Sequence, residues 1–527
     1  MAQIQKSAGR PARKAHAATA AMRTPNASAA PGAGRCIAVL DVGTTAVKAC
    51  LFSPALELLA CSVQEYALHT QGECVEVDAA QYKAAARAGL ADALAQAPGL
   101  TPAAVGVTTQ GETFVPVDVS GAPLRPFIVW LDSRAQTEAQ ALRGTLDEEM
   151  FYKTTGLPEI SGALPLAKLL WLRQNEPDTF ARTRKFLLLE DYLLHWLTGR
   201  FVSEKSLQTS TGWFDLHSDA LWTQGLAAAG VSVALLPELL ECGAPAGPLL
   251  PGPAEELGLS PGIPVVAGAM DQTAAALAAG CTRPGTVTET TGTALVMAAC
   301  TDAPAFCSGH HVTVYRHALP GKYLYLPIGN TAGMALRWFR DEFCRDLPAG
   351  AQGYTALDAL AQSVPCGCEG LVFLPFLSGS VDPDACPQAR AAFFGARLST
   401  TRAHFTRSVM EAVAFLLRDF FSMLDALGCP ADTVYSLGGG ARSTVWQQIK
   451  ADACGRAFRV PACSEATAMG AALLAGWGSG LIVPGTFPAC GESAVYLPDN
   501  ANAPAYDTAY SLYKNLYAAV KPLYGAL

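Results

Sequence analysis

The sequence contains no long hydrophobic run. Half of its 527 residues are hydrophobic, yet no stretch reaches 18 uninterrupted apolar residues, the length that a membrane-spanning helix needs. The apolar core of a secretory signal peptide is also missing near residue 1. We therefore expect neither a membrane span nor a membrane partner for this chain.

Closely spaced metal-binding motifs are missing as well. The sixteen cysteines are scattered, the tightest pair is Cys366-Gly-Cys368, and no histidine pattern accompanies it. Structural zinc sites need four cysteine or histidine ligands in closely spaced pairs, so we expect no zinc site. Scattered thiols are typical of a reducing compartment, and the expected location is the cytoplasm.

Acidic residues are absent from residues 1–35, which hold six basic residues. The rest of the chain therefore carries a net charge of −14, whereas the whole chain carries −8. This negative charge on the chain after residue 35 argues against nucleic-acid binding, because such binding depends on the neutralisation of phosphate groups by basic residues. Residues 1–35 are rich in small residues and proline and lack apolar periodicity, which predicts a disordered basic tail. A targeting segment and a true start at Met22 are the alternatives.

The length and the pattern together indicate two α/β domains. A chain of 527 residues exceeds one ordinary core. Residues 36–52 and 285–293 both read as strand, glycine turn, strand, which suggests a duplicated fold of mixed sheets with helices. We place the boundary near residue 280, giving domains at 36–280 and 281–527. Helices are expected at 78–97, 164–175, 186–198, 400–427, 443–454 and 466–477, and further strands at 105–109, 127–130, 263–268, 371–376 and 434–437.

Two glycine-rich turns about four hundred residues apart predict phosphate binding. The apolar run 37–45 ends in glycine and threonine after Asp41, and the run 434–441 ends in three glycines. A carboxylate beside phosphate oxygens suits Mg²⁺, and Lys48 adds a positive point charge. The alternatives are an ordinary hairpin turn and a tight strand-to-helix connection.

Two other segments place polar side chains after a strand. Asp271 follows the strand 263–268, where a carboxylate can accept the proton of a hydroxyl that attacks phosphate; a helix N-cap is the alternative. Gln110 and Glu112 follow the strand 105–109 and, with Trp130, could bind the hydroxyls and the carbon face of a polyol or sugar. In the alternative, Trp130 is a core residue and Asp132 and Arg134 form a structural pair, which we favour for Arg134.

These motifs occur in an order that resembles the FGGY family of carbohydrate kinases. The series is Asp41-Val-Gly-Thr-Thr, Gln110-Gly-Glu-Thr, Trp130-Leu-Asp-Ser-Arg, Gly268-Ala-Met-Asp-Gln, Thr291-Gly-Thr and Gly438-Gly-Gly-Ala-Arg-Ser. Residues 165–175 and the segment from 391 to 411 resemble the two signatures of the family, and the helix near 506–524 is also similar. The resemblance runs from about residue 36 to about residue 480. It implies an α/β fold of two ribonuclease-H-like domains, as in actin and hexokinase, with a nucleotide cleft between them.

The resemblance also implies ATP and Mg²⁺ as cofactors and a small sugar or polyol as substrate. Asp271 matches the catalytic base of the family, and Asp41 matches the residue associated with Mg²⁺. The matching nucleotide-binding positions are Gly43, Thr44, Thr45, Lys48, Thr291, Gly292, Thr293, Gly439 and Gly440. The matching acceptor positions are Gln110, Glu112, Trp130 and Gln272. The sequence leaves a homodimer open as a partner, and closure by a hinge near residues 268–290 would exclude water.

The acceptor motif departs from both of the branches that it resembles. Xylulokinases usually carry Met-His-Gly where this chain has Gln110-Gly-Glu, and glycerol kinases carry Arg-Glu where it has Gly111-Glu112. The missing arginine removes a five-donor fork and leaves room for a larger acceptor, and residues 201–215 resemble xylulokinases. We therefore expect phosphorylation of a terminal hydroxyl of a ketopentose such as xylulose. Glycerol or another polyol is the first alternative, and an actin-like binding or sensor protein without kinase activity is the second.

Overall fold

Two sheets form the framework of the computed structural model, which describes residues 34–306, 311–462, 465–487 and 491–526. The predicted tail, apart from its last two residues, lies outside the described residues. The strands of the first sheet are β1 (Arg35–Val42), β2 (Ala46–Phe52), β3 (Leu58–Glu65), β6 (Thr101–Thr109), β14 (Pro245–Pro248) and β15 (Pro264–Ala267). Those of the second are β16 (Thr286–Thr291), β17 (Leu295–Thr301), β18 (Val314–Arg316), β19 (Tyr323–Tyr325), β20 (Ile328–Gly329), β23 (Thr433–Leu437), β24 (Phe458–Pro461) and β25 (Glu492–Tyr496).

The two sheets repeat one strand pattern. In the first sheet the order is β14-β15-β6-β1-β2-β3, with β1 antiparallel to β2 and parallel to β6, and β6 parallel to β15. In the second, β16 is antiparallel to β17 and parallel to β23, and β23 is parallel to β24. A hairpin extended by two parallel strands thus occurs twice, which confirms the duplicated α/β fold.

Smaller sheets and sixteen α-helices complete the described part of the chain. A third sheet has the order β4-β5-β8-β7-β9, from β4 (His69–Gln71), β5 (Cys74–Val77), β7 (Phe114–Val117), β8 (Phe127–Ile128) and β9 (Lys185–Leu188). Two-stranded pairs are β10 (Val202–Glu204) with β13 (Glu238–Leu240), β11 (Phe214–Asp215) with β12 (Ala220–Leu221), and β21 (Val372–Leu374) with β22 (Ala392–Phe394). The helices are α1 (Ala79–Gln96), α2 (Gln136–Arg143), α3 (Glu148–Thr155), α4 (Pro165–Asn175), α5 (Pro177–Arg182), α6 (Leu189–Thr198), α7 (Lys205–Gln208), α8 (Thr223–Ala228), α9 (Pro251–Leu257), α10 (Asp271–Ala278), α11 (Gly333–Phe343), α12 (Ala351–Gln362), α13 (Arg402–Ala426), α14 (Thr444–Cys454), α15 (Ala466–Ser479) and α16 (Ala503–Val520).

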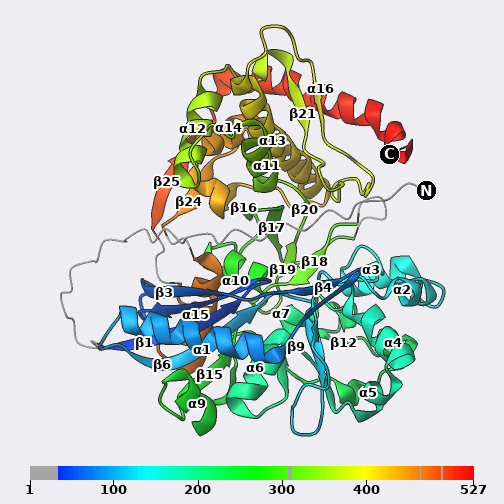
Figure 1. Cartoon of the computed structure of the whole chain (residues 1–527), viewed down its shortest axis with the longest axis vertical. Coiled ribbons are helices and arrows are strands. Elements are labelled where there is room, and N and C mark those ends of the chain that lie inside the picture. The colour runs from blue at the N-terminus through cyan, green and yellow to red at the C-terminus, as the bar shows by residue number, and fades with distance from the viewer. Residues whose placement is uncertain (1–33, 307–310, 463–464, 488–490, 527) are drawn as a thin grey trace, which may run out of the picture. The chain divides into compact units, whose positions relative to one another are not determined.

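The central strand β1 is buried on both faces, as its continuous apolar sequence predicts. Side chains of a strand alternate between the two faces of the sheet. Ala38 and Leu40 belong to the core that includes residues of α1, whereas Ile37 and Val39 belong to the core that includes residues of α15. Helices therefore cover both faces, and α15 on the second face comes from the C-terminal half of the chain (Figure 1).

Small residues allow α15 to lie very close to the first sheet and to α10. A Cβ atom at Gly106 of β6 would lie 2.9 Å from the carbonyl oxygen of Ala471. A Cβ atom at Gly470 of α15 would lie 2.0 Å from the carbonyl oxygen of Ala274. Because backbone atoms cannot move away as a flexible side chain can, these glycines are required for the contact.

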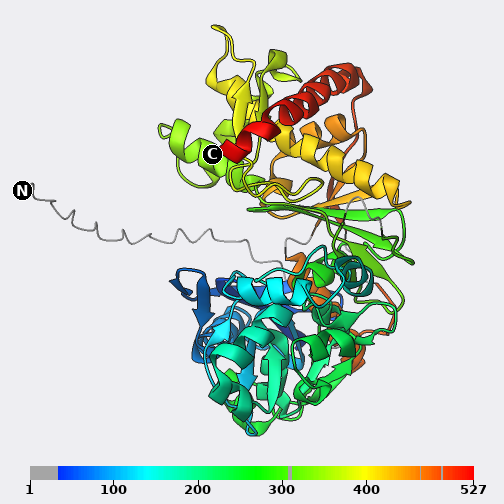
Figure 2. The ribbon, with the colours of Figure 1, turned by 90° about the vertical axis from the view of Figure 1, so that its right-hand side faces the viewer.

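In the second half, the long helix α13 is buried along most of its length, and α16 runs beside it (Figure 2). Phe415 of α13 contacts the rings of Tyr506, Tyr510 and Tyr513, whose centroids lie 5.6 to 6.5 Å away. Aromatic rings at this separation attach the C-terminal helix to the core of the second half. None of the described helices is long and apolar enough to cross a membrane.

Two expectations about local structure are wrong. Residues 186–188 belong to strand β9 and not to a helix, because β9 pairs with β7 and the helix starts only at Leu189. The Asp191 carboxylate accepts the Leu188 amide at 2.8 Å, which favours a helix start at this point. The strand expected over 127–130 ends at Ile128.

The packing of α15 predicts that Gly470→Ala destabilises the protein. The added methyl group meets a backbone carbonyl, so the helix must move, and overpacking of this kind costs about 1–3 kcal/mol. Gly252→Ala in α9 is the matched control, because nothing lies within 4 Å of its added Cβ atom. Urea unfolding measures both variants, and equal stability of the two would contradict this account of the contact.

Candidate active site

Three parallel strands of the first sheet end at one edge, and a predicted site residue lies at each end. Asp41 is the penultimate residue of β1, Gln110 follows β6, and Asp271 lies beyond β15. Carboxyl ends of neighbouring parallel strands meet at the same edge of a sheet. The Thr108 hydroxyl donates to the Ala269 carbonyl at 2.6 Å and links the second strand end to the third.

Asp271 is the first residue of α10, while Met270 occupies the N-cap position. The alternative role of Asp271 as an N-cap therefore does not hold. Its Oδ1 atom accepts the amide of Gln272 at 2.6 Å. Burial and, to a smaller extent, the negative charge of Asp41 raise the pKa of Asp271 to about 7. A carboxyl group with a pKa near neutrality is suited to accepting a proton from a hydroxyl.

The turn after β1 holds the predicted phosphate-side residues. Burial raises the pKa of Asp41 to about 6, although Lys48 Nζ lies 4.0 Å from its Oδ2 and opposes the shift. Lys48 also donates to Glu465 Oε2 at 2.7 Å. Glu465 directly precedes α15, so this bond joins β2 to the C-terminal half of the chain. The backbone carbonyls of Gly43 and Thr45 accept hydrogen bonds from the hydroxyl and the amide of Tyr66.

Trp130 connects this turn to the acceptor side. The residue is 39% exposed, and its Nε1 donates to Thr44 Oγ1 at 3.0 Å. Trp130 is therefore not a core residue. Asp132, two residues further on, is fully buried, accepts the Val75 amide at 2.6 Å and binds Arg134. The Asp132–Arg134 pair is structural, as expected.

Glu112 has a strained backbone and a perturbed carboxyl group. Its φ angle is +62°, which is uncommon for a residue with a side chain and is often found at functional sites. Its amide donates to Ser210 Oγ at 3.2 Å, and a Cβ atom at Gly111 would lie 2.8 Å from the same oxygen. Burial raises the pKa of Glu112 to about 7, Lys168 opposes this shift, and Asp271 adds to it.

The side chain of Gln110 is buried and has unused hydrogen-bonding groups. It is 4% exposed, and neither its oxygen nor its nitrogen has a hydrogen-bond partner within the described part of the chain. Leaving such groups unpaired is costly, so an orphaned amide at this edge favours a ligand that both donates and accepts. A hydroxyl group does both. Gln272 is partly exposed beside Asp271 at the same edge.

Sequence reasoning missed two residues of the acceptor side. Lys168 of α4 is fully buried, its Nζ donates to the Val129 carbonyl at 3.0 Å, and burial lowers its pKa to about 8. Tyr315 of β18 is buried; burial raises its pKa well above the usual value, and the charges of Glu112 and Asp271 add to this. A lone lysine in the apolar helix 165–175 was a usable signal. Tyr315 gave no signal, because only the fold brings it near Glu112 and Asp271.

The predicted nucleotide residues of the second half gather at one edge of the second sheet. Parallel strands β16 and β23 end there, at the turn Thr291-Gly-Thr and at the three glycines from Gly438. A cavity of about 530 Å³ is lined by Thr291, Gly292, Thr293, Gly439 and Gly440, with residues of α11, α12 and α14. Gly440 is required here, because a Cβ atom would lie 2.6 Å from the Thr291 side chain.

A buried ion pair supports this turn and was also missed. Lys450 Nζ donates to Glu289 Oε1 at 2.8 Å and to Thr291 Oγ1 at 2.7 Å, and both charged side chains are fully buried. Ser436 donates to the same carboxylate. The pair fixes the orientation of the Thr291 hydroxyl under the cavity.

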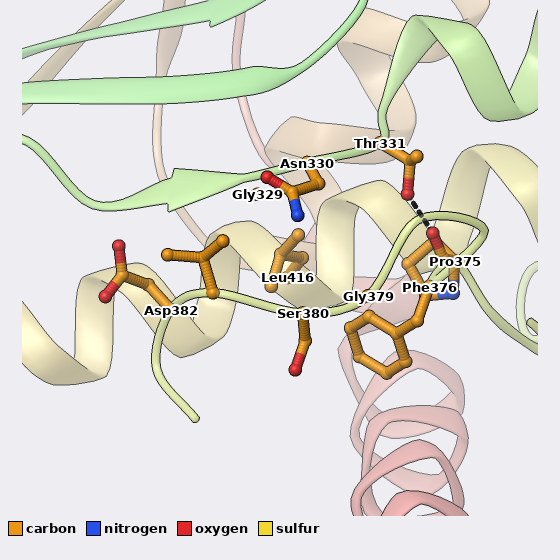
Figure 3. Close-up of a pocket in the computed structure, with 10 residues that line it drawn as sticks. Gly329, Asn330, Thr331, Pro375, Phe376, Gly379, Ser380, Asp382 and Leu416 are labelled. Atoms are coloured by element: carbon orange, nitrogen blue, oxygen red, sulfur yellow. Dashed lines mark hydrogen bonds between the residues drawn. The ribbon is translucent and has the colours of Figure 1, made fainter. Parts of the chain in front are cut away.

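A cavity of about 1110 Å³ is lined by both halves of the chain and reaches Glu112 and Tyr315. Its far wall includes the loop drawn in Figure 3, where a small pocket contains Ser380 and Asp382. Asp382 Oδ2 accepts the Ile328 amide at 2.7 Å, and the Thr331 hydroxyl donates to the Pro375 carbonyl, as the dashed line in Figure 3 marks. These bonds hold the loop in place. Because Ser380 and Asp382 line both pockets, the small pocket is part of the wall of the larger cavity.

Known proteins match this chain over most of its length. The family model "FGGY family of carbohydrate kinases, N-terminal domain" matches residues 36–278, and the corresponding C-terminal domain matches residues 287–479. A gluconokinase of Bacillus licheniformis is 27% identical over 496 residues, 92% of this chain and 96% of its own length. A xylulose kinase of Escherichia coli (strain K12) is 30% identical over 425 residues, 80% of this chain and 85% of its own. The crystal structure of xylulose kinase from Rhodospirillum rubrum has a TM-score of 0.84 and 31% identity, and covers 93% of this chain and 100% of that chain.

The raised pKa of Asp271 predicts a pH-dependent gain in stability for Asp271→Asn. The folded chain resists ionisation of this carboxyl group until its pKa of about 7, whereas the unfolded chain ionises it near its ordinary value of 3.8. Wild-type stability without ligand therefore falls as the pH rises through this range, and the asparagine variant avoids that loss. Relative to wild type, Asp271→Asn should gain about 1–3 kcal/mol between about pH 4 and about pH 8.

Urea unfolding at several pH values measures this difference. Asp178→Asn is the control, because Asp178 is an exposed carboxylate in the first turn of α5. An Asp271→Asn gain that is independent of pH, or that the control reproduces, would contradict the raised pKa of Asp271.

Proposed function

Because the chain belongs to the FGGY family of carbohydrate kinases, we propose that it transfers the γ-phosphoryl group of ATP to a terminal hydroxyl of a ketopentose such as xylulose. The observation that carries the proposal is the set of polar side chains around Asp271 at the edge of the first sheet. The charge of Asp41 opposes the ionisation of Asp271, and the charge of Asp271 opposes that of Glu112. Gln110, at the end of the neighbouring strand β6, has unused polar groups. Family membership sets aside the non-enzymatic alternative.

In the proposed reaction, Asp271 accepts the proton of the acceptor hydroxyl as its oxygen attacks the γ-phosphorus and ADP leaves. A pKa of about 7 leaves much of the Asp271 carboxyl ionised at neutral pH while keeping it basic enough to take the proton. Gln110 and Glu112 hold other hydroxyls of the sugar, and the Trp130 ring packs against its carbons. Lys48 exchanges Glu465 for phosphate oxygens when the nucleotide is bound.

The residues present fit a magnesium ion. Two carboxyl groups, Asp41 and Asp271, have raised pKa values because of burial, and the charge of Asp41 opposes ionisation of Asp271. Within the described residues no group of three or more histidine, cysteine or acidic side chains could hold a metal. Mg²⁺ suits such a site, because it binds through one or two carboxylates together with phosphate oxygens and water. Bound there, Mg²⁺ would offset the charge of the phosphate groups and of the two carboxylates.

The charge of the cavity favours a neutral sugar over a sugar acid such as gluconate. Glu112, Glu159 and Asp382 contribute carboxyl groups to the lining of the larger cavity. Its cation Lys514 is already bound to Asp419 at 2.7 Å. A carboxylate substrate needs an available arginine or lysine to compensate its charge. We therefore place a ketopentose ahead of gluconate, and ahead of glycerol because the arginine of glycerol kinases is missing.

The domain assignment forms part of the same proposal. We place the sugar and the catalytic base on residues 36–280 and the nucleotide on residues 281–527. The packing of α15 on the first sheet keeps these parts in contact. We propose that closure occurs by a hinge near residues 268–290.

The role of Asp271 predicts that Asp271→Asn reduces turnover by roughly a thousandfold, because the variant cannot accept the proton. ATP binding, measured by calorimetry, should stay close to wild type, since the nucleotide cavity belongs to the second sheet. In the wild type, kcat should rise with pH through about 7 as Asp271 ionises. Near-normal turnover of the variant would overturn the assignment of the base.

The charge of the cavity predicts which acceptor stimulates ATP turnover. An ADP-release assay with Mg-ATP compares D-xylulose, L-xylulose, D-ribulose and L-ribulose with glycerol, erythritol and gluconate. One ketopentose should give the highest kcat/KM. A higher value for gluconate would show that a cation becomes available in the cavity, and a higher value for glycerol would overturn the argument from the missing arginine.

A further inference from the structure

The backbone before Asp271 is held by buried side chains from three other segments. The Gly268 amide donates to Glu190 Oε1 at 2.9 Å. The Ala269 carbonyl accepts the Thr108 hydroxyl. The Met270 amide donates to Glu204 Oε1 and to Ser206 Oγ, both at 3.1 Å. The four side chains that make these bonds, from Thr108, Glu190, Glu204 and Ser206, are fully buried.

We infer that Glu204 is a positioning residue for the kinase reaction: it orients the turn 268–270 so that the Asp271 carboxylate meets the acceptor hydroxyl. This inference rests on the proposed function, in which Asp271 is the base. Positioning matters for a proton acceptor, because a shift of about 1 Å can reduce the rate roughly a hundredfold. Glu204 does not touch the substrate, and acts through the Met270 amide.

Both carboxylate oxygens of Glu204 accept hydrogen bonds. Oε1 accepts the Leu207 amide at 2.6 Å, the Ser206 hydroxyl at 2.9 Å and the Met270 amide. Oε2 accepts the Ser206 amide at 2.5 Å and the Cys242 thiol at 2.8 Å. Glu204 therefore starts helix α7 and holds the turn before Asp271 with the same group. A glutamine cannot replace it, because its NH₂ group would face an N–H donor whichever way the amide is turned.

Glu190 provides a matched contrast on the other side of the same turn. It is equally buried and also accepts one backbone amide, but its Oε2 has no partner among the residues that the structure describes. Burial raises the pKa of Glu190 well above its usual range, and the charges of Glu204 and Asp191 raise it further. A neutral glutamine can keep the bond to Gly268 and place its NH₂ group where no donor competes. Glu190→Gln is therefore a tolerated change of the same chemical type.

The test compares the single-turnover rates of Glu204→Gln and Glu190→Gln, with a saturating acceptor from the panel above. Glu204→Gln should lower the rate by roughly 10- to 100-fold and leave the KM for ATP unchanged. Glu190→Gln should keep the wild-type rate. Thr108→Val removes the bond to Ala269 without changing the shape of the side chain, and it should lower the rate in the same way. This variant tests the positioning of the turn if Glu204→Gln does not fold.

The pH profile separates positioning from a general loss of stability. A displaced Asp271 is better hydrated, so the acid limb of the rate should move from about pH 7 towards the ordinary carboxyl range in Glu204→Gln and not in Glu190→Gln. Asp41 acts on the ionisation of Asp271, and Asp41 in turn is influenced by Lys48 and Glu465. Asp271 influences Glu112 and Tyr315, and Lys168 opposes the shift at Glu112; all of these groups are kept in both variants. Folded Glu204→Gln and Thr108→Val with wild-type rates and unshifted profiles would overturn the inference. Turnover by Asp271→Asn would instead overturn the proposed function.

Discussion

The close contact between α15 and the first sheet is the constraint on which the rest of the structure depends. Glycine at positions 106 and 470 lets backbone approach backbone, so a helix from the C-terminal half completes the core of the N-terminal half. The same helix begins next to Glu465, whose bond to Lys48 reaches the phosphate-side turn. The two halves are thus joined beside the turn that follows Asp41.

The edge of the first sheet is an environment that disfavours the ionisation of its carboxyl groups. Burial raises the pKa values of Asp41, Glu112 and Asp271, so the folded chain holds three carboxyl groups that resist ionisation without a ligand. Such a site is a cost to stability and a benefit to proton transfer. Lys168 behind Glu112 and Lys48 beside Asp41 reduce the cost only in part. A metal ion with phosphate groups, and a sugar with hydroxyls, would supply what these groups lack.

Much of the fold and of the candidate site could be predicted from local sequence, because the residues that form each strand end and turn lie in one short segment of the chain. The turns after β1 and β23, the strand before Asp271 and the polar residues after β6 are each an apolar run that ends in glycine or in a polar residue. The sequence did not predict the start of α6 at Leu189, since strand pairing decides it. It left open whether Trp130 is a core residue, and its exposed position in the structure excludes that alternative. Glu204 carries no local signal of its link to Met270, which lies 66 residues away.

The sequence by itself determined the family, the duplicated α/β architecture and the candidate residues at the strand ends, because each is encoded in the order of short motifs. The tertiary structure alone decided which side chains share an environment. Tyr315 and Lys168 reach Glu112, Lys450 supports Thr291, and Glu204 holds the backbone before Asp271, each across a large distance in the chain. Burial and the nearness of charges set their pKa values and hydrogen bonds, and both arise only when the strands and helices have packed together.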